Sequence, residues 1–184
     1  EIASCLVGSE MCIRDSYDNP QQGARANSAG LDLTNEHRLG SLSAALLASA
    51  GTLWRAGPML GEGDQAWDAA RAIEVRNPAN LRDTVGHVIE AQADEADTAL
   101  RAAANAAPIW QSTPVAERAQ CLRRAAQLLE EQMQTLLGLI VREAGKSLPN
   151  AIAEVREAVD FLRYYADQAC LLYTSDAADD MQCV

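Results

Sequence analysis

An apolar stripe from Val115 to Ile140, with spacing that alternates between four and three residues, constrains the fold of this chain most. Side chains at this spacing lie on one face of an α-helix, and so long an apolar face must be buried against another element. The stripe consists of Val115, Ala119, Leu122, Ala126, Leu129, Met133, Leu136 and Ile140. We therefore predict one helix from Thr113, with Pro114 at its first position, to Gly145, which suits the residue after a helix end.

A second amphipathic helix is predicted to begin near Pro149. Its main apolar stripe comprises Ile152, Val155, Val159, Leu162 and Ala166. A second face of the same helix carries Ala153, Glu157, Phe161 and Tyr164. One acid lies there between a small residue and two aromatic residues, so Glu157 could line a pocket and contact a cationic group of a ligand. An exposed helix glutamate without a ligand is the alternative that the sequence leaves open.

The charged residues on either side of Glu157 are predicted to form a solvated helix face. They are Glu154, Arg156, Asp160 and Arg163. Arg156 and Asp160 have the i,i+4 spacing of an ion pair that stabilises a helix by about 0.2–0.5 kcal/mol. We therefore expect these four residues to contribute to solubility and not to a site.

Two short strands are predicted at 72–76 and 84–91. The run Asn77-Pro78-Ala79-Asn80 between them contains turn-forming residues, since proline fixes φ and asparagine tolerates unusual backbone angles. The pattern indicates a β-hairpin with a longer loop. Together with the helices, it predicts a fragment that is mostly α with one β-hairpin.

Two further helices are predicted before and after this hairpin. One is expected at about 35–55, with Thr34 or Asn35 accepting hydrogen bonds from its first free backbone N–H groups. The other is expected at about 94–107, where Pro108 ends it. The segment between 57 and 70 is rich in glycine and is predicted to be a loose connection.

The charge balance argues against two classes of partner. The chain has 184 residues and a formal net charge of −11, whereas nucleic-acid binding requires a basic face and a membrane anchor of the polybasic type requires clustered lysine and arginine. No apolar run approaches the ~20 residues of a membrane-spanning helix. Glu1 and Glu10 stand where the basic region of a signal peptide would be. We therefore expect a cytoplasmic protein.

No catalytic or metal-binding motif is recognisable in the residues themselves. The five cysteines form no C-x-x-C pair, and with two histidines, His37 and His87, they do not indicate a metal site. Cys121 is expected to be a buried or half-exposed structural thiol, because no neighbouring residue suggests a lowered thiol pKa. Gly145-Lys146-Ser147 resembles the end of a phosphate-binding loop but lacks the earlier glycine and follows a helix.

The two ends of the chain differ in character from its middle. Residues 1–16 show neither a helical nor a strand period, and residues 170–184 interrupt a helix that has no stop signal at Ala169. We interpret both stretches as translated sequencing-adaptor read-through and give their cysteines no role, with ordinary frayed termini as the alternative. Residues 17–71 are then a connector with one helix, and 72–169 are the start of a domain.

Several stretches resemble bacterial enzymes that join a proline dehydrogenase to an L-glutamate γ-semialdehyde (1-pyrroline-5-carboxylate) dehydrogenase. RANSAGLDLTNEHRLGSLSAALLASA, at 25–50, resembles the connector between their two catalytic domains. EVRNPANLRDTVGHVIEA, at 74–91, resembles the hairpin that opens their aldehyde dehydrogenase domain. The helical stretches 107–133 and 141–166, with the E-x-G-K element Glu143–Lys146, resemble the helices that follow. The fragment is therefore expected to be part of an α/β, Rossmann-like domain.

This resemblance implies a function for the parent enzyme. Such enzymes oxidise proline with FAD and then L-glutamate γ-semialdehyde to glutamate with NAD, and the parent is expected to be a homo-oligomer. Glu157, in the run EAVDF, matches a glutamate near the ammonium group of the substrate. The family's nucleophilic cysteine, general base, cofactor loop and FAD-binding barrel match no residue of this chain.

These departures limit what the isolated fragment is expected to do. It should bind neither NAD nor FAD, contain no catalytic residue and be inactive without the remainder of the parent polypeptide. A helical interaction or linker module without enzymatic activity is the alternative, since the stripe from Val115 to Ile140 could also form a coiled-coil seam.

Overall fold

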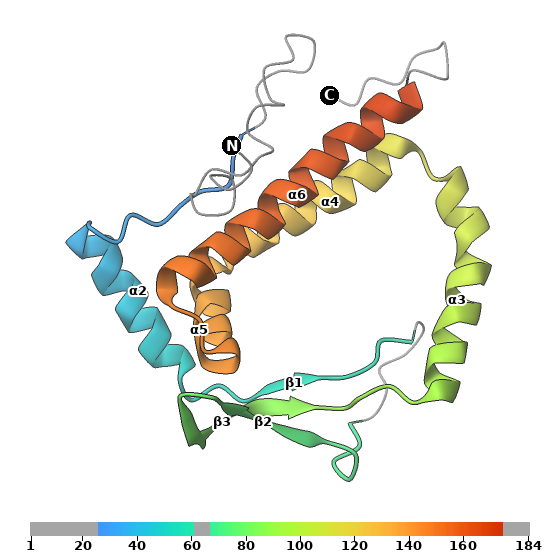
Figure 1. Cartoon of the computed structure of the whole chain (residues 1–184). Coiled ribbons are helices and arrows are strands. Elements are labelled where there is room, and N and C mark those ends of the chain that lie inside the picture. The colour runs from blue at the N-terminus through green and yellow to red at the C-terminus, as the bar shows by residue number, and fades with distance from the viewer. Residues whose placement is uncertain (1–25, 61–66, 175–184) are drawn as a thin grey trace, which may run out of the picture.

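The computed structural model describes residues 26–60 and 67–174, with side chains to Cys170. Residues 1–16, and 175–184 of the stretch 170–184, were interpreted as read-through and lie outside the described part. Residues 17–25 and 61–66 of the predicted connector lie outside it as well. In chain order the elements are α2 (Glu36–Ser49), β1 (Trp54–Ala56), β2 (Ile73–Asn77), β3 (Asn80–Val88), α3 (Ala93–Ser112), α4 (Val115–Glu131), α5 (Met133–Ala144) and α6 (Leu148–Thr174). The strands form one side of an open ring, and the pair α4 and α6 forms the opposite side (Figure 1). The predicted fold, mostly α with a hairpin, is confirmed.

A small three-stranded sheet has the order β1-β3-β2. The predicted hairpin is confirmed, because β2 pairs antiparallel with β3, with Val75 opposite Gly86. The longer loop is wrong, since Asn77 already pairs with Asn80 and β3 begins there and not at residue 84. β1 pairs parallel with β3 and was not predicted, since three residues are too few to show a strand period. A Cβ atom on Gly86 would lie 2.3 Å from the carbonyl oxygen of Trp54. Glycine at this position therefore permits the close approach of β1.

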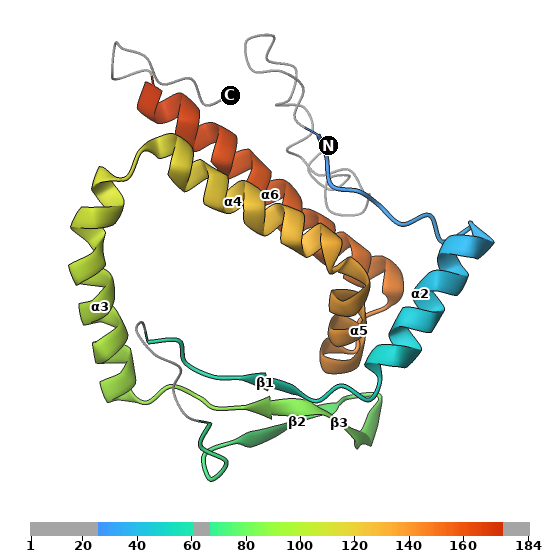
Figure 2. The same cartoon turned by 180° about the vertical axis from the view of Figure 1, so that it is seen from behind.

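The helix predicted from Thr113 to Gly145 is two helices in the structure. It breaks at Gln132, whose φ of −102° and ψ of 10° are not helical. α4 packs along α6 through the buried Ala119, whereas α5 packs against α2 and the start of α6 through Leu137 (Figures 1 and 2). The break lets one apolar stripe cover partners that lie in different directions. The stripe is thus not the continuous seam that a coiled coil requires.

Two apolar clusters hold the helices together. The larger joins α2, α5 and the first turns of α6, and its buried members are Leu42, Met133, Leu137, Ala151, Ile152 and Val155. The smaller joins α4 to the far end of α6, and its buried members are Ala119, Ala166 and Cys170. Four of the five predicted stripe residues of α6 are buried, and Leu162 is half-buried. α6 continues to Thr174 and does not stop at Ala169.

The residues predicted to begin α2 and to end α5 have these roles in the structure. The Asn35 side chain accepts hydrogen bonds from the backbone N–H groups of His37 and Arg38, both at 3.1 Å, so it is the N-cap of α2. That helix ends at Ser49, earlier than predicted, because the chain continues into β1. Gly145 follows α5 with a φ of 64°, the left-handed conformation that closes helices.

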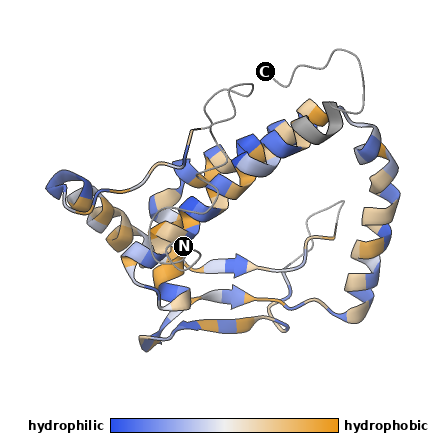
Figure 3. Cartoon of the chain, turned by 45° about the horizontal axis from the view of Figure 1, so that its top comes forward, coloured by the Kyte–Doolittle hydropathy of each residue, from blue (hydrophilic) through white to orange (hydrophobic). Residues whose placement is uncertain are grey.

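α3 differs from its prediction and stands apart from the other elements. Pro108 lies inside the helix, which continues to Ser112. A proline removes one backbone hydrogen bond, and here water can reach the carbonyl left free, because α3 has no buried residue. Leu100, Ile109 and Trp110 are exposed. No other described helix or strand packs against α3, although Figure 3 colours parts of it as hydrophobic.

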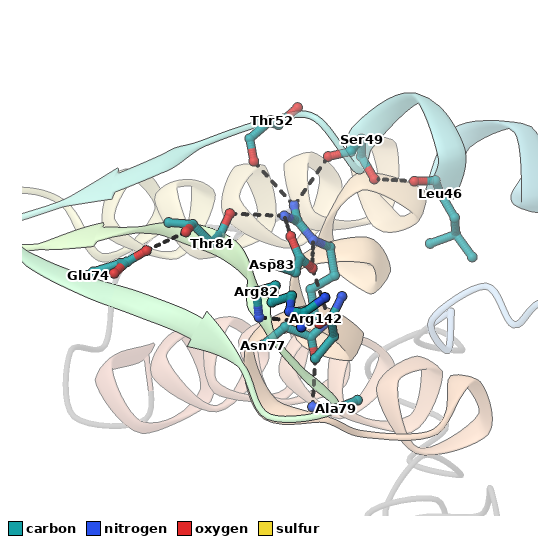
Figure 4. A network of polar contacts seen from close by, with 11 residues as sticks. Leu46, Ser49, Thr52, Glu74, Asn77, Ala79, Arg82, Asp83, Thr84 and Arg142 are labelled. Atoms are coloured by element: carbon teal, nitrogen blue, oxygen red, sulfur yellow. Dashed lines mark hydrogen bonds and ion pairs between the residues drawn. The ribbon is translucent and has the colours of Figure 1, made fainter.

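Arg142 of α5 joins the sheet to the helices (Figure 4). Its guanidinium binds Asp83 of β3 at two points, with Nη2 to Oδ1 at 2.7 Å and Nε to Oδ2 at 3.2 Å. Nη1 also donates to the carbonyl oxygens of Ser49 and Thr52, at the end of α2, and Nη2 to that of Thr84. One side chain therefore links three parts of the fold.

This ion pair should make the stability of the chain depend on acid pH. The Arg142 guanidinium, and after it the Asn77 amide, hold the pKa of the Asp83 carboxyl at about 2, well below its ordinary value of 3.8. The carboxylate is stabilised in the folded state, so its contribution is complete above pH ~4 and is lost as the pH falls towards 2. We expect Asp83→Asn to be less stable than the wild type at pH 7 and to lose less stability over that pH range.

Urea unfolding followed by circular dichroism at several pH values would measure this dependence. Asp97→Asn, on the exposed face of α3, is a matched control and should retain the wild-type profile. Equal pH dependence of Asp83→Asn and the wild type between pH 4 and 2 would show that the ion pair does not set acid stability.

Candidate functional site

Glu157, the one candidate site residue, lies on the exposed side of α6. Val155 and Val159, on either side of it in sequence, are buried and fix which face of the helix points inward. Ala153 and Glu157 are exposed, one turn apart, and Phe161 follows one turn later with its ring partly exposed. The helix period thus places the carboxylate and this aromatic residue on one accessible face, as the sequence predicted.

An aromatic group extends along α6 beyond Glu157. Phe161 stacks on Tyr165 with ring centroids 6.0 Å apart and planes at 17°. Tyr165 in turn makes an edge contact with Tyr164, at 5.3 Å and 72°. Tyr165 is exposed and Tyr164 half-buried, so Tyr165, which the sequence analysis did not include, shares the group with Phe161. Its i,i+4 spacing from Phe161 was the signal for this contact.

A carboxylate beside aromatic rings can bind a cationic ligand. The carboxylate supplies a charge-assisted hydrogen bond to an ammonium group, and a ring face adds a cation–π attraction when the cation lies within about 6 Å. The ion pairs of α6 among the described residues use Glu154, Arg163 and Asp167 and not Glu157, so its charge is available to a ligand. The arrangement supports binding, and it offers no nucleophile or proton-transfer pair.

The charged neighbours of Glu157 differ from the predicted solvated face. Asp160 is buried, and it accepts hydrogen bonds from Ser28 and not from Arg156. Arg163 donates to both carboxylate oxygens of Glu130 on α4. Glu154 forms an exposed ion pair with Lys146. The prediction is therefore wrong for Asp160 and for its ion pair with Arg156, because a segment distant in sequence covers this part of α6. It is also wrong for Arg163, which is half-buried against α4.

The other residues considered from the sequence form no cluster in the described part of the chain. Cys121 is exposed, whereas a buried or half-exposed thiol was predicted. His37 is exposed on α2, and His87 is half-buried on β3. Within residues 26–60 and 67–174, no group of three or more histidine, cysteine or acidic residues could hold a metal ion. No described helix is long and apolar enough to cross a membrane.

Hollows lined by described residues lie elsewhere on the molecule. One, of about 470 Å³, lies between the segment before α2 and the start of α6, lined by Leu31, Asp32, Ile152 and Arg156 among others. The other, of about 140 Å³, lies on the sheet beside Glu143. Glu157 lines neither of these two hollows, and among the described residues its side chain is exposed on α6.

Residues 66–182 match the aldehyde dehydrogenase family, and the chain belongs to this family.

Within the aldehyde dehydrogenase family, the chain is similar to enzymes of proline catabolism. The chain is 58% identical to the bifunctional protein PutA of Escherichia coli over 155 residues, which are 84% of this chain and 11% of that protein. It is 49% identical over 145 residues to the PutA protein of Rhizobium meliloti, again 11% of its length. It is 37% identical over 111 residues to 1-pyrroline-5-carboxylate dehydrogenase 2 of Bacillus subtilis, covering 60% of this chain and 21% of that one. The predicted relationship to bifunctional proline-catabolic enzymes is confirmed.

Solved structures show the same fold. A 1-pyrroline-5-carboxylate dehydrogenase of Thermus thermophilus has a TM-score of 0.73 at 28% identity, over 86% of this chain and 30% of that chain. PutA of Bdellovibrio bacteriovorus has a TM-score of 0.75 at 24% identity, over 82% of this chain and 16% of that chain. The chain thus spans a small part of each relative, 11% of the PutA protein of Escherichia coli.

Proposed function

We propose that this chain is the first part of the aldehyde dehydrogenase domain of an enzyme that oxidises L-glutamate γ-semialdehyde to glutamate with NAD. The identity of 58% to a bifunctional PutA protein is the observation that carries this proposal. In the same parent an FAD-dependent site would oxidise proline to 1-pyrroline-5-carboxylate. We propose the cytoplasm as the location of this enzyme and a homo-oligomer as its assembly.

The fragment contributes substrate binding to this reaction and not the bond-making groups. L-glutamate γ-semialdehyde carries an α-ammonium group, and Glu157 is an exposed carboxylate beside Phe161. Its role is to hold the ammonium group so that the aldehyde reaches a nucleophile supplied by the remainder of the enzyme. Binding a group of the substrate that is remote from the reacting carbon orients that carbon, and in this way binding energy contributes to catalysis.

The described residues do not fit NAD or FAD. A dinucleotide requires backbone N–H groups at a glycine-rich turn before a helix, and the sequence has no such motif. Gly145 has the left-handed conformation of a helix end, and Lys146 next to it is paired with Glu154. NAD therefore belongs to residues elsewhere in the proposed enzyme, and the isolated chain is proposed to be inactive.

A chimeric enzyme tests this function. Residues 26–170 of this chain would replace the matched segment of the PutA protein of Escherichia coli, and the chimera should oxidise the semialdehyde. In it, Glu157→Gln is expected to raise KM for L-glutamate γ-semialdehyde about tenfold to a hundredfold, the loss of one charged hydrogen bond. Steady-state NADH formation at 340 nm would measure the change.

Two controls distinguish ammonium binding from a general defect. Glu117→Gln, an exposed acid in the first turn of α4, should leave KM unchanged. Glutarate semialdehyde, which lacks the amine, should react equally with the Glu157→Gln variant and its parent chimera. An equal KM for L-glutamate γ-semialdehyde with and without Glu157 would contradict the binding role, and an inactive chimera would contradict the proposed enzyme.

A further inference from the structure

Asp160 is a buried carboxylate that the proposed function does not use. It lies on α6 within one turn of Glu157, and it is 6% exposed. Its Oδ1 accepts a hydrogen bond from the backbone N–H of Ser28 at 2.7 Å, and its Oδ2 accepts one from the Ser28 hydroxyl at 2.9 Å. Ser28 is itself 4% exposed. A carboxylate with two short hydrogen bonds in a buried place holds its partner firmly.

Further contacts tie the same segment to α6 and α4. We call residues 26–29, the segment that precedes α2 (Figure 1), the strap. Arg163 of α6 donates to the carbonyl oxygen of Ala26 at 3.2 Å, and Arg156 donates to the hydroxyl of Ser28 at 3.3 Å. The N–H of Ala29 donates to Glu130 of α4 at 2.7 Å. The strap thus crosses both helices and is bound at each of these points.

The charges around the strap are balanced. Two acids, Asp160 and Glu130, meet two arginines, Arg156 and Arg163, and Arg163 pairs with Glu130 at 2.6 Å. A half-buried set of charges is tolerated when each member has an opposite charge or a hydrogen-bond partner. Removal of Asp160 would leave the Ser28 donors unsatisfied in a buried place and would release the strap from this turn of α6.

We propose that the strap is a positioning device for Glu157, with Ser28 and Asp160 as positioning residues. This inference rests on the proposed function, because it assumes that Glu157 binds substrate. Asp160 and Glu157 share one helical turn, so a movement of that turn would displace the Glu157 carboxylate. A displacement of about 1 Å in a positioning group can reduce catalytic efficiency by up to about a hundredfold. The strap belongs to the segment 17–71 that was predicted to be only a connector.

The first arm of the test measures the helix in this chain. We expect Asp160→Ala to increase hydrogen–deuterium exchange of the α6 amides from 153 to 163 by about tenfold, because the strap no longer holds this turn. Asp160→Asn keeps one acceptor oxygen and should have a smaller effect. Asp167→Ala is the matched control, since it removes a different α6 ion pair, at 3.1 Å from Arg123, that does not involve the strap. Unchanged exchange in Asp160→Ala would overturn the proposal.

The second arm measures KM and kcat of the chimera for L-glutamate γ-semialdehyde. We expect Asp160→Ala to raise KM about tenfold while kcat changes less than about twofold, with Asp160→Asn between it and the parent chimera. Ser28→Ala removes the hydroxyl hydrogen bond and keeps the hydrogen bond from the Ser28 backbone N–H to Asp160. This milder variant should raise KM by a smaller factor, and it tests the proposal if Asp160→Ala does not fold. Asp167→Ala should leave both constants unchanged.

The two proposals fail in different ways. An active parent chimera whose KM does not change in Asp160→Ala or Ser28→Ala overturns the positioning role and leaves the proposed function standing. A parallel fall of kcat with unchanged KM, in the strap variants and the Asp167→Ala control alike, also overturns it, because it indicates general destabilisation. An inactive parent chimera overturns the proposed function and the positioning role together.

Discussion

Replacing Leu137 by alanine is expected to lower the free energy of unfolding of this chain by about 2–5 kcal/mol. Leu137 is 0% exposed and lies in the core cluster that joins α2, α5 and α6. The substitution removes buried apolar surface and leaves a cavity among helices that cannot all move to fill it. For a chain of this size the melting temperature should fall by about 10 °C, as measured by circular dichroism at 222 nm.

A leucine on the surface supplies the matched control for this result. Leu47 on α2 is 75% exposed, so Leu47→Ala should change the free energy of unfolding by less than about 0.5 kcal/mol. If both variants lose stability equally, the α2, α5 and α6 cluster is not the core that holds the chain together.

Removing the Arg142 guanidinium should have the next largest effect. Arg142→Ala is expected to cost about 2–3 kcal/mol, because the Asp83 carboxylate and the carbonyl oxygens of Ser49 and Thr52 lose their donor. The side chain of Arg142 is only 12% exposed, so water cannot fully replace it. Urea unfolding at pH 7 would measure the loss.

The geometry of this site predicts that lysine cannot replace Arg142. Lysine has one point charge, whereas the site uses three guanidinium nitrogens toward different acceptors. Arg142→Lys should therefore recover less than half of the lost stability. Arg124→Ala is the control, since its pair with Glu131 is long, at 3.8 Å, and exposed, and should cost under about 0.5 kcal/mol. If Arg142→Ala does not change the free energy of unfolding, the sheet packs on the helices without help from the hydrogen bonds of Arg142.

Features set by neighbouring residues were predictable from the sequence. The apolar stripe of α6, the hairpin of β2 and β3, the Asn35 cap and the Gly145 helix end all depend on residues within a few positions of each other. Their physical causes are the helix and strand periods and local hydrogen bonds, which any chain with this sequence would share. The exposed face with Glu157 also follows from the same helix period. The motifs of the chain indicated that it belongs to the aldehyde dehydrogenase family.

Other features depend on contacts between distant residues. Asp160 has the pattern of a solvated helix residue, and it is buried only because Ser28, 132 positions earlier, covers it. β1 exists because Gly86 lets Trp54 approach β3. The break at Gln132 similarly directs α5 towards α2. One continuous helix with the same apolar stripe could not contact both α2 and the far end of α6.

The sequence by itself therefore determined the type and inward face of most elements, and the class of enzyme to which they belong. The tertiary structure alone decided where the long helix breaks, which polar residues are buried and that the strap holds α6. The physical reason is that local periods depend on backbone geometry, whereas the burial of a polar side chain depends on a partner that only the folded chain brings within hydrogen-bond distance.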